Sequence, residues 1–265
     1  RVGEVLSGDI VKDADGNTLW TPGKLKHVKA IGWFIEEYGV TQVTMNITNI
    51  TETPLHLAFD ETAKAANARG IRATGSELVG LVPLSAMLEA GKYFLRKQNR
   101  STGIHESELI KIAIKSMGLD ELGPFIPEER IIEYMLESGT DKKLVDLSLT
   151  DFANETASES PAPGGGSISA YAGALGISLA TMVANLSAHK RGWDERWEEF
   201  SDWADQGQIL KDELLFLVDE DTNSFNKIME AMRLPKGTNA EKKVRKEAMD
   251  VATKYAILTP FRVME

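Results

Sequence analysis

The chain lacks cysteine altogether, and its 265 residues carry fewer basic than acidic side chains. Without cysteine there is no disulfide, no thiolate metal site and no cysteine nucleophile. The four histidines do not form a cluster with acidic residues at ligand spacing, so we expect no metal. The formal net charge of −10 argues against a general nucleic-acid-binding protein, because such proteins need a basic surface.

Charged side chains are also absent locally, over residues 160–189. The apolar part of this stretch, residues 168–188, has the length of a membrane span. Its many Gly, Ala, Ser and Thr residues make it only weakly hydrophobic, so we expect a buried helix instead. The chain opens Arg1-Val2-Gly3 without a signal-peptide pattern, and we expect a cytoplasmic protein.

A proline- and glycine-rich turn, Pro161–Ser167 (PAPGGGS), opens this uncharged stretch. Prolines restrict its backbone, glycines remove side chains, and a serine suits the start of a helix. Backbone N–H groups at a helix N-terminus attract an anion or a polar ligand edge. One interpretation is therefore a substrate-binding turn, and the other is a tight structural turn. The candidate binding residues are Pro163, Gly164, Gly165, Gly166 and Ser167.

Residues 1–138 alternate between the spacing of helices and that of strands, which predicts a small ferredoxin-like α/β sandwich. Pro22 and Gly39 are typical of a helix start and stop, and Val43, Met45 and Ile47 alternate as in a half-buried strand. We expect helices over residues 22–38, 54–69, 84–97 and 106–117, and strands over 43–47 and 71–82.

A polar segment, residues 139–145, is a candidate linker, and residues 146–265 show helical spacing only. This second domain is therefore predicted to be an all-α helical bundle, with helices near 149–152 and over 168–188, 194–232 and 239–258. Small residues recur in steps of four at Ala172, Gly176, Ala180 and Ala184. Such a face suits either close packing within the domain or the seam of a dimer, and the sequence leaves both open.

One carboxylate interrupts an apolar stripe in the long helix predicted over residues 194–232. Asp221 falls three residues after Val218 and four before Phe225, on the face predicted to be core. Burial without a partner favours the protonated carboxyl, which suits a general acid. The alternative is a structural carboxylate that caps a neighbouring helix or pairs with a lysine. We interpret Asp219 and Glu220 as solvated charges. The stripe consists of Leu214, Leu217, Val218, Phe225, Ile228 and Met232.

Basic residues that could receive an anionic substrate lie at two places. Lys190 and Arg191 directly follow the uncharged helix, and Lys236 lies in the segment after the long helix. Each group could instead be an ordinary solvated surface. The glycine run lacks the Gly-Lys-Ser/Thr ending of a nucleotide-binding loop.

These residues also resemble a known family. The second part is similar to the cyclodeaminase domain of the formimidoyltransferase-cyclodeaminase family at Ser160–Ser167, Leu217–Asp221 and Glu230–Lys236. The first part resembles the C-terminal subdomain of the same family's transferase domain at Gly75–Leu84 and Glu128–Tyr134. The two parts stand in the family's order, which makes chance similarity improbable.

The resemblance implies a folate-dependent enzyme of histidine degradation with two activities. The family transfers a formimino group from N-formimino-L-glutamate to tetrahydrofolate, and its second domain releases ammonia to give 5,10-methenyltetrahydrofolate. It implies polyglutamylated tetrahydrofolate as co-substrate and a homo-oligomer built from dimers. The family's cyclodeaminase aspartate matches Asp221, which agrees with the argument from the stripe.

The resemblance also implies that this chain is a piece of a longer protein. The family's catalytic histidine and main folate-binding loop belong to an N-terminal subdomain that no part of this sequence matches, and His56 is expected to be a structural helix residue. We therefore expect no formimino transfer from residues 1–138 alone. Two alternatives stay open: a methenyltetrahydrofolate cyclohydrolase-type enzyme, and a non-catalytic folate-binding or assembly module.

Overall fold

A computed structural model describes residues 11–19, 23–137 and 143–265. The chain forms two compact units. Unit 1 comprises residues 1–77 and 117–122, and unit 2 comprises residues 78–116 and 123–265. The described parts combine many helices with a small antiparallel sheet, which confirms the mixed α and β composition.

Unit 1 contains a two-stranded antiparallel sheet, β1 (Val28–Ile35) and β2 (Val40–Ile47). The register pairs Val28 with Ile47 and Ile35 with Val40. The predicted strand at 43–47 is confirmed, but the helix predicted over 22–38 is wrong where the chain is described. Gly39 has φ +64° in the hairpin turn. A helix stop and a hairpin both place glycine at positive φ, so this signal could not separate them.

Helix α1 (Leu55–Asn67) follows the hairpin and confirms the helix predicted over residues 54–69. His56 is buried within it, as expected of a structural residue. The strand predicted over 71–82 is wrong. Within the described chain its only ladder contact is an isolated bridge from Val82 to Ile131, and Val79 is exposed. Alternating apolar residues form a strand only where a partner strand is available.

The first part of unit 2 is a small helical cluster. Helices α2 (Leu84–Arg96) and α3 (Glu106–Met117) confirm two predictions, and α4 (Pro127–Arg130) and α5 (Ile132–Glu137) follow. The backbones of α2 and α3 approach closely, since a Cβ on Gly91 would lie 2.3 Å from the Leu109 carbonyl oxygen. The buried side chains here include Met87, Ala90, Leu109, Ile110, Ala113 and Ile131.

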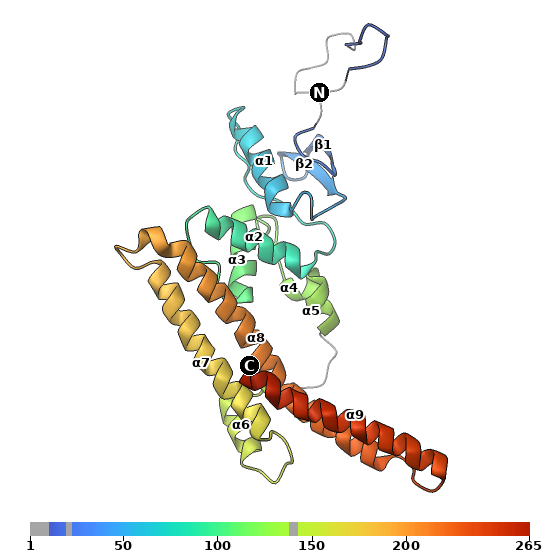
Figure 1. Ribbon diagram of the computed structural model, residues 1–265. Helices are drawn as coiled ribbons and strands as arrows, with labels where there is room; N and C mark the ends of the chain where they lie inside the picture. The colour runs from blue at the N-terminus through green and yellow to red at the C-terminus, as the bar shows by residue number, and fades with distance from the viewer. Residues whose placement is uncertain (1–10, 20–22, 138–142) are drawn as a thin grey trace. The chain divides into compact units, whose positions relative to one another are not determined.

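The remainder of unit 2 is all-α, as predicted for residues 146–265 within the described range. It contains a 3₁₀ turn η1 (Leu144–Asp146), helix α6 (Leu149–Thr156), α7 (Gly165–Ala188), turn η2 (Asp194–Arg196), α8 (Trp197–Arg233) and α9 (Asn239–Met264). Helices α7 and α8 run side by side, and α9 packs along the later part of α8 (Figure 1). Of the candidate linker, residues 139–142 lie outside the described chain.

One face of α7 packs on α8, and it differs from the predicted stripe of small residues. Ala172, Gly176 and Ala180 are exposed, and of the predicted four only Ala184 is buried. The packed face comprises Ser167, Ala170, Ala174, Thr181, Ala184 and Ala188. The close packing within the domain therefore uses another set of small residues, and the dimer seam stays a prediction.

The outer face of α7 is strongly apolar. It carries Leu175, Leu179, Met182, Val183 and Leu186, each at least half exposed. By length and composition alone, α7 is long and apolar enough to cross a membrane, and 28% of its most apolar window is buried inside the protein. A single helix of this kind is weak evidence for a membrane, and the prediction of a buried helix holds only for the face on α8.

Candidate functional site

The glycine turn directly precedes and begins α7. Pro163 is buried, the Ala162–Pro163 peptide bond is cis, and Gly164 stands at the N-cap position in an extended conformation. Gly164 has no side chain with which to cap the helix, so the first N–H groups need an acceptor from elsewhere.

Asp221 of α8 supplies that acceptor. Its Oδ2 accepts a hydrogen bond from the Ser167 backbone N–H at 3.0 Å and lies 3.3 Å from the Ser167 hydroxyl. The Ser167 hydroxyl also donates to the Val218 carbonyl oxygen at 2.8 Å. A carboxylate at a helix N-terminus is favoured by the free N–H groups and by the helix dipole. The structure therefore brings together the two features that the sequence analysis singled out, the glycine turn and Asp221.

At one position of the turn, an added side chain would collide with this carboxylate. A Cβ on Gly166 would lie 2.2 Å from Asp221 Oδ1 and 2.5 Å from its Cγ. At Gly165 a Cβ would meet nothing within 4 Å. The carboxylate thus rests directly against the backbone of residue 166.

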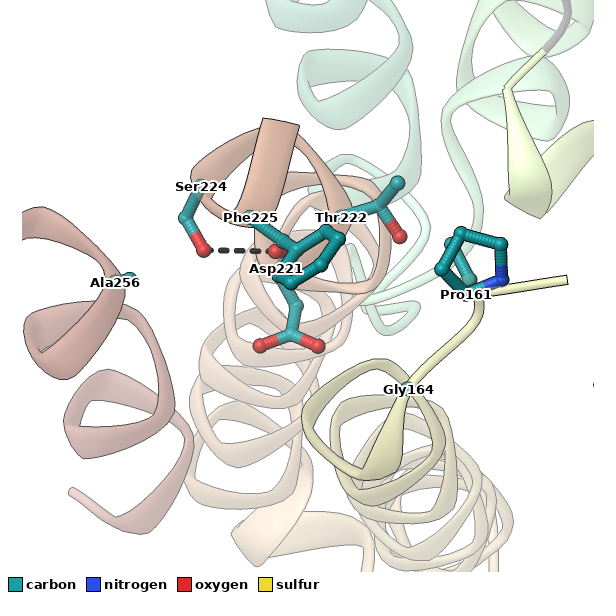
Figure 2. A pocket seen from close by; sticks show the side chains of 8 residues that line it. Pro161, Gly164, Asp221, Thr222, Ser224, Phe225 and Ala256 are labelled. Atoms are coloured by element: carbon teal, nitrogen blue, oxygen red, sulfur yellow. Dashed lines mark hydrogen bonds between the residues drawn. The ribbon is translucent and has the colours of Figure 1, made fainter. Parts of the chain in front are cut away.

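A cavity of about 210 Å³ opens beside this carboxylate (Figure 2). In Figure 2 the Asp221 side chain lies between Gly164 and Ala256 of α9, with the Phe225 ring beside it. Sequence reasoning missed Thr222, Ser224 and Phe225 as lining residues, although helical spacing from Asp221 would have indicated the last two. The lining is Pro161, Ala162, Gly164, Asp221, Thr222, Ser224, Phe225 and Ala256.

The apolar stripe around Asp221 is only partly core. Leu217 and Val218 are fully buried, but Phe225 is 42% and Met232 46% exposed. The prediction of a continuous core stripe is therefore wrong beyond Val218. Asp221 itself is half-buried, and it is stabilised by a helix N-terminus rather than isolated among apolar side chains.

The neighbouring acidic residues are not solvated charges, contrary to the sequence-based interpretation. Asp219 Oδ1 accepts the Leu144 backbone N–H at 2.6 Å, which holds η1 against α8. Glu220 is 8% exposed and accepts hydrogen bonds from the Tyr255 hydroxyl and, at 3.3 Å, from Asn223. Three successive acidic residues therefore contact three different segments.

The Glu220 contacts connect α8 to α9. The Lys227 ammonium lies 3.5 Å from Glu220 and 3.9 Å from the centre of the Tyr255 ring. Burial acts to raise the pKa of Glu220, but the hydrogen bonds from Tyr255 and Asn223 and the charge of Lys227 outweigh it, so the pKa lies below its ordinary value. The same hydrogen bond raises the pKa of Tyr255.

This arrangement predicts an acid-dependent loss of stability. A carboxyl whose folded-state pKa is lowered stabilises the fold above its ordinary pKa of about 4.5, and the benefit disappears as the pH falls through the folded-state value. Tyr255→Phe removes the strongest stabilising contact of the carboxylate. We expect it to lower the melting temperature at pH 7 by roughly 3 °C and to reduce the further drop as the pH falls from 7 to well below 4.5, as measured by thermal unfolding. A variant with the wild-type pH dependence would contradict this account.

The predicted basic residues do not meet Asp221 within one chain. Lys190 and Arg191 lie just beyond the C-terminal end of α7, about 36 Å along the helix from the glycine turn. The Lys190 ammonium lies 4.3 Å from the centre of the Trp193 ring. Lys236 is exposed after the end of α8, at least 18 Å along the helix from Asp221. The structure therefore places these cations away from the cavity.

Two family models match the chain in succession. The formiminotransferase domain model matches residues 8–137, and the formiminotransferase-cyclodeaminase model matches residues 148–265. The chain belongs to the formimidoyltransferase-cyclodeaminase family. The glycine turn and Asp221 both lie in the region that the second model matches.

Individual relatives agree with this assignment. The chain is 40% identical over 240 residues to formimidoyltransferase-cyclodeaminase of Gallus gallus, covering 90% of this chain and 44% of the relative. It is 37% identical over 245 residues to that of Mus musculus, covering 92% of this chain and 45% of the relative. The chain thus spans less than half the length of these relatives. It is also 32% identical over 113 residues to methenyltetrahydrofolate cyclohydrolase of Methylorubrum extorquens, covering 43% of this chain and 54% of the relative.

Proposed function

We propose that this chain is part of a bifunctional folate enzyme that transfers a formimino group from N-formimino-L-glutamate to tetrahydrofolate and then cyclodeaminates the product. The observation that carries the second activity is the Asp221 carboxylate, held by Ser167 at the edge of a cavity. Family membership and the order of the two matched regions support the assignment.

Ring closure needs one proton that the folate does not supply. In 5-formiminotetrahydrofolate, N10 attacks the formimino carbon attached to N5, and a C–N bond forms. The formimino nitrogen leaves as ammonia after gaining two protons, one from N10–H and one from an acid. The products are ammonia and the 5,10-methenyl cation, so a single proton is consumed in each turnover. We assign its delivery to Asp221 as proton shuttle, because a general acid must lie within hydrogen-bond reach of the leaving nitrogen and Asp221 is the titratable side chain that lines the described cavity.

The size of the cavity sets which part of the substrate it receives. About 210 Å³ is below the usual range for a complete ligand of drug size, so we place only the reacting end of the folate beside Asp221. The turn from Pro163 to Ser167 would contact a polar edge of that end through its backbone. No metal is needed for this step, since the leaving group requires only a proton.

The remaining family properties are proposals for the complete protein. We propose that β1 and β2 belong to a ferredoxin-like α/β sandwich within the whole transferase domain. We propose that residues 1–138 belong to the transferase domain, residues 139–145 form a linker, and residues 146–265 belong to the cyclodeaminase domain. We propose a cytoplasmic homo-oligomer of dimers. A seam through Ala172, Gly176 and Ala180 is supported by the exposed apolar face of α7.

The deciding experiment supplies 5-formiminotetrahydrofolate to the complete protein and follows methenyltetrahydrofolate absorbance together with ammonia. We expect both signals to rise in equal amounts. A protein that binds the folate and releases no ammonia would overturn the proposal in favour of a binding or assembly module.

A cyclohydrolase is the second candidate, favoured by the match of 113 residues to the Methylorubrum extorquens enzyme. Such an enzyme would add water to methenyltetrahydrofolate and release no ammonia. The transferase-like region, matched over residues 8–137, favours the cyclodeaminase. Supplying methenyltetrahydrofolate alone separates the two, because only a cyclohydrolase consumes it.

The role proposed for the basic pair follows from charge. We propose that Lys190 and Arg191 bind the glutamyl carboxylates of a polyglutamylated folate. We propose that Lys236 binds such a carboxylate at a separate place on the chain. Replacing both Lys190 and Arg191 by Glu is expected to weaken binding of a polyglutamylated folate at least tenfold more than that of the monoglutamate, since each carboxylate contact is charge-assisted. Isothermal titration with both ligands measures this difference. Equal losses for the two folates would count against the assignment.

A further inference from the structure

A short loop from the transferase-matched region is embedded in the cyclodeaminase-matched helices. Ser101 and Thr102 are each 2% exposed, and Gly103 is buried. These three residues, which we call the STG loop, lie between α2 and α3, within residues 8–137 that the transferase model matches. Their contacts, however, are with α7 and α8, which belong to the other matched region.

The backbone of the loop touches the backbone of α8. A Cβ on Gly103 would lie 2.3 Å from the Ala204 Cβ and 2.4 Å from the Ala204 carbonyl carbon. Backbone atoms cannot move aside as a flexible side chain does, so a larger residue at position 103 would have to push the loop off the helix. The contact is therefore a shape match that glycine alone permits.

The polar groups of the loop are matched by α7 and α8. Asn185 of α7 accepts a hydrogen bond from the Ser101 hydroxyl at 2.6 Å and donates one to the Gly103 carbonyl at 2.7 Å. Gln208 of α8 donates to the same carbonyl at 3.1 Å. The Thr102 N–H donates to the Ser201 hydroxyl at 3.0 Å. Buried polar groups that lose such partners destabilise a fold, so the loop and the helices depend on one another.

A charge of α8 is also balanced from the transferase-matched side. Asp205 accepts the Thr102 hydroxyl at 2.6 Å and lies 3.2 Å from the Lys92 ammonium of α2. Both Lys92 and Asp205 are partly buried, with side-chain exposures of 27% and 22%. Removing residues 78–116 would leave this carboxylate without its hydroxyl donor and its cation.

We propose that the contacts of the STG loop with α7 and α8 make residues 78–116 and α7–α8 unfold as one cooperative unit across the boundary between the two matched regions. The compact unit formed by residues 78–116 and 123–265 contains all of these segments. The inference rests on these contacts and not on the proposed reaction.

The test is thermal unfolding of the whole chain combined with hydrogen exchange resolved along the sequence. Thr102→Val keeps the shape and removes two hydrogen bonds of the Thr102 hydroxyl, one to Asp205 Oδ2 at 2.6 Å and one shared with the Ser201 hydroxyl at 3.2 Å. We expect its melting temperature to fall by about 3 °C and exchange to accelerate together in α2, α3 and residues 200–208, with β1 and β2 unchanged. Faster exchange confined to residues 100–105 would overturn the proposal.

Two further comparisons keep the test decisive. Gly103→Ala is expected to accelerate exchange in the same segments by at least tenfold, whereas Gly123→Ala, in the same compact unit and with nothing within 4 Å of the added Cβ, is expected to leave exchange unchanged. If Gly103→Ala does not fold, a double-mutant cycle of Thr102→Val and Ser201→Ala, measured as free energies of unfolding, decides. If the double variant loses less free energy of unfolding than the two single variants together, the loop and α8 are coupled. If the losses are strictly additive, the coupling is refuted.

Discussion

Asp221→Asn is expected to lower the rate of ring closure by about 10²- to 10⁴-fold, the range that general acid catalysis supplies. Asparagine has the shape of aspartate, and its amide oxygen would still accept the Ser167 N–H that Asp221 accepts at 3.0 Å. Its neutral amide has no acidic proton to deliver to the leaving nitrogen. The fold and folate binding are therefore expected to survive, and methenyltetrahydrofolate and ammonia would fall together in a single-turnover assay.

Asp219→Asn is the matched control two residues away. Asp219 contacts the Leu144 backbone N–H rather than the cavity, so this variant is expected to close the ring at close to the wild-type rate. This variant should instead have a lower free energy of unfolding, because the contact between η1 and α8 is weaker. If Asp219→Asn were the inactive variant and Asp221→Asn the active one, the proton shuttle would be assigned to the wrong carboxylate.

Gly166→Ala has the second-largest expected effect, and it acts through geometry. The added Cβ would lie 2.2 Å from Asp221 Oδ1, so the carboxylate must move by about 1 Å or more to restore an ordinary contact. A misplacement of that size costs roughly 10²-fold in rate. We expect a fall of this order in ring closure with the carboxyl group still present, measured in the same assay.

Gly165→Ala is the matched control for this substitution. It adds the same methyl group one residue earlier, where nothing lies within 4 Å, and it is expected to leave the rate within about twofold of wild type. Equal losses from Gly165→Ala and Gly166→Ala would show that the turn tolerates no side chain for reasons unrelated to Asp221. In that case the contact between Gly166 and the carboxylate would carry no part of the mechanism.

Several helices and the two candidate features of the site were predictable from the sequence. Proline before an apolar segment marked the starts of α1 and α2, and the charge-free segment after the glycine turn marked α7. These signals are local, because capping and apolar spacing act over a few residues. The family resemblance, which depends on short stretches in a given order, was also available from the sequence and is confirmed by the two model matches.

Other features depended on partners far away in the chain. Residues 28–35 carry apolar residues at spacings that suit a helix, and pairing with residues 40–47 made them a strand. Residues 71–79 alternate as a strand would and form none in the described chain. Whether a segment becomes a strand depends on the neighbour that completes its hydrogen bonds, and local spacing does not report that neighbour.

By itself the sequence determined the family, the helical second part, the glycine turn and the acidic residue that interrupts an apolar stripe. Only the tertiary structure decided what Asp221 contacts, since its partner Ser167 lies 54 positions away and meets it through the packing of α7 on α8. It likewise decided that Glu220 pairs with Tyr255 and that Lys190 lies at the far end of α7. Chemistry that acts at hydrogen-bond distance depends on which helix faces meet, and that is a property of the packed molecule.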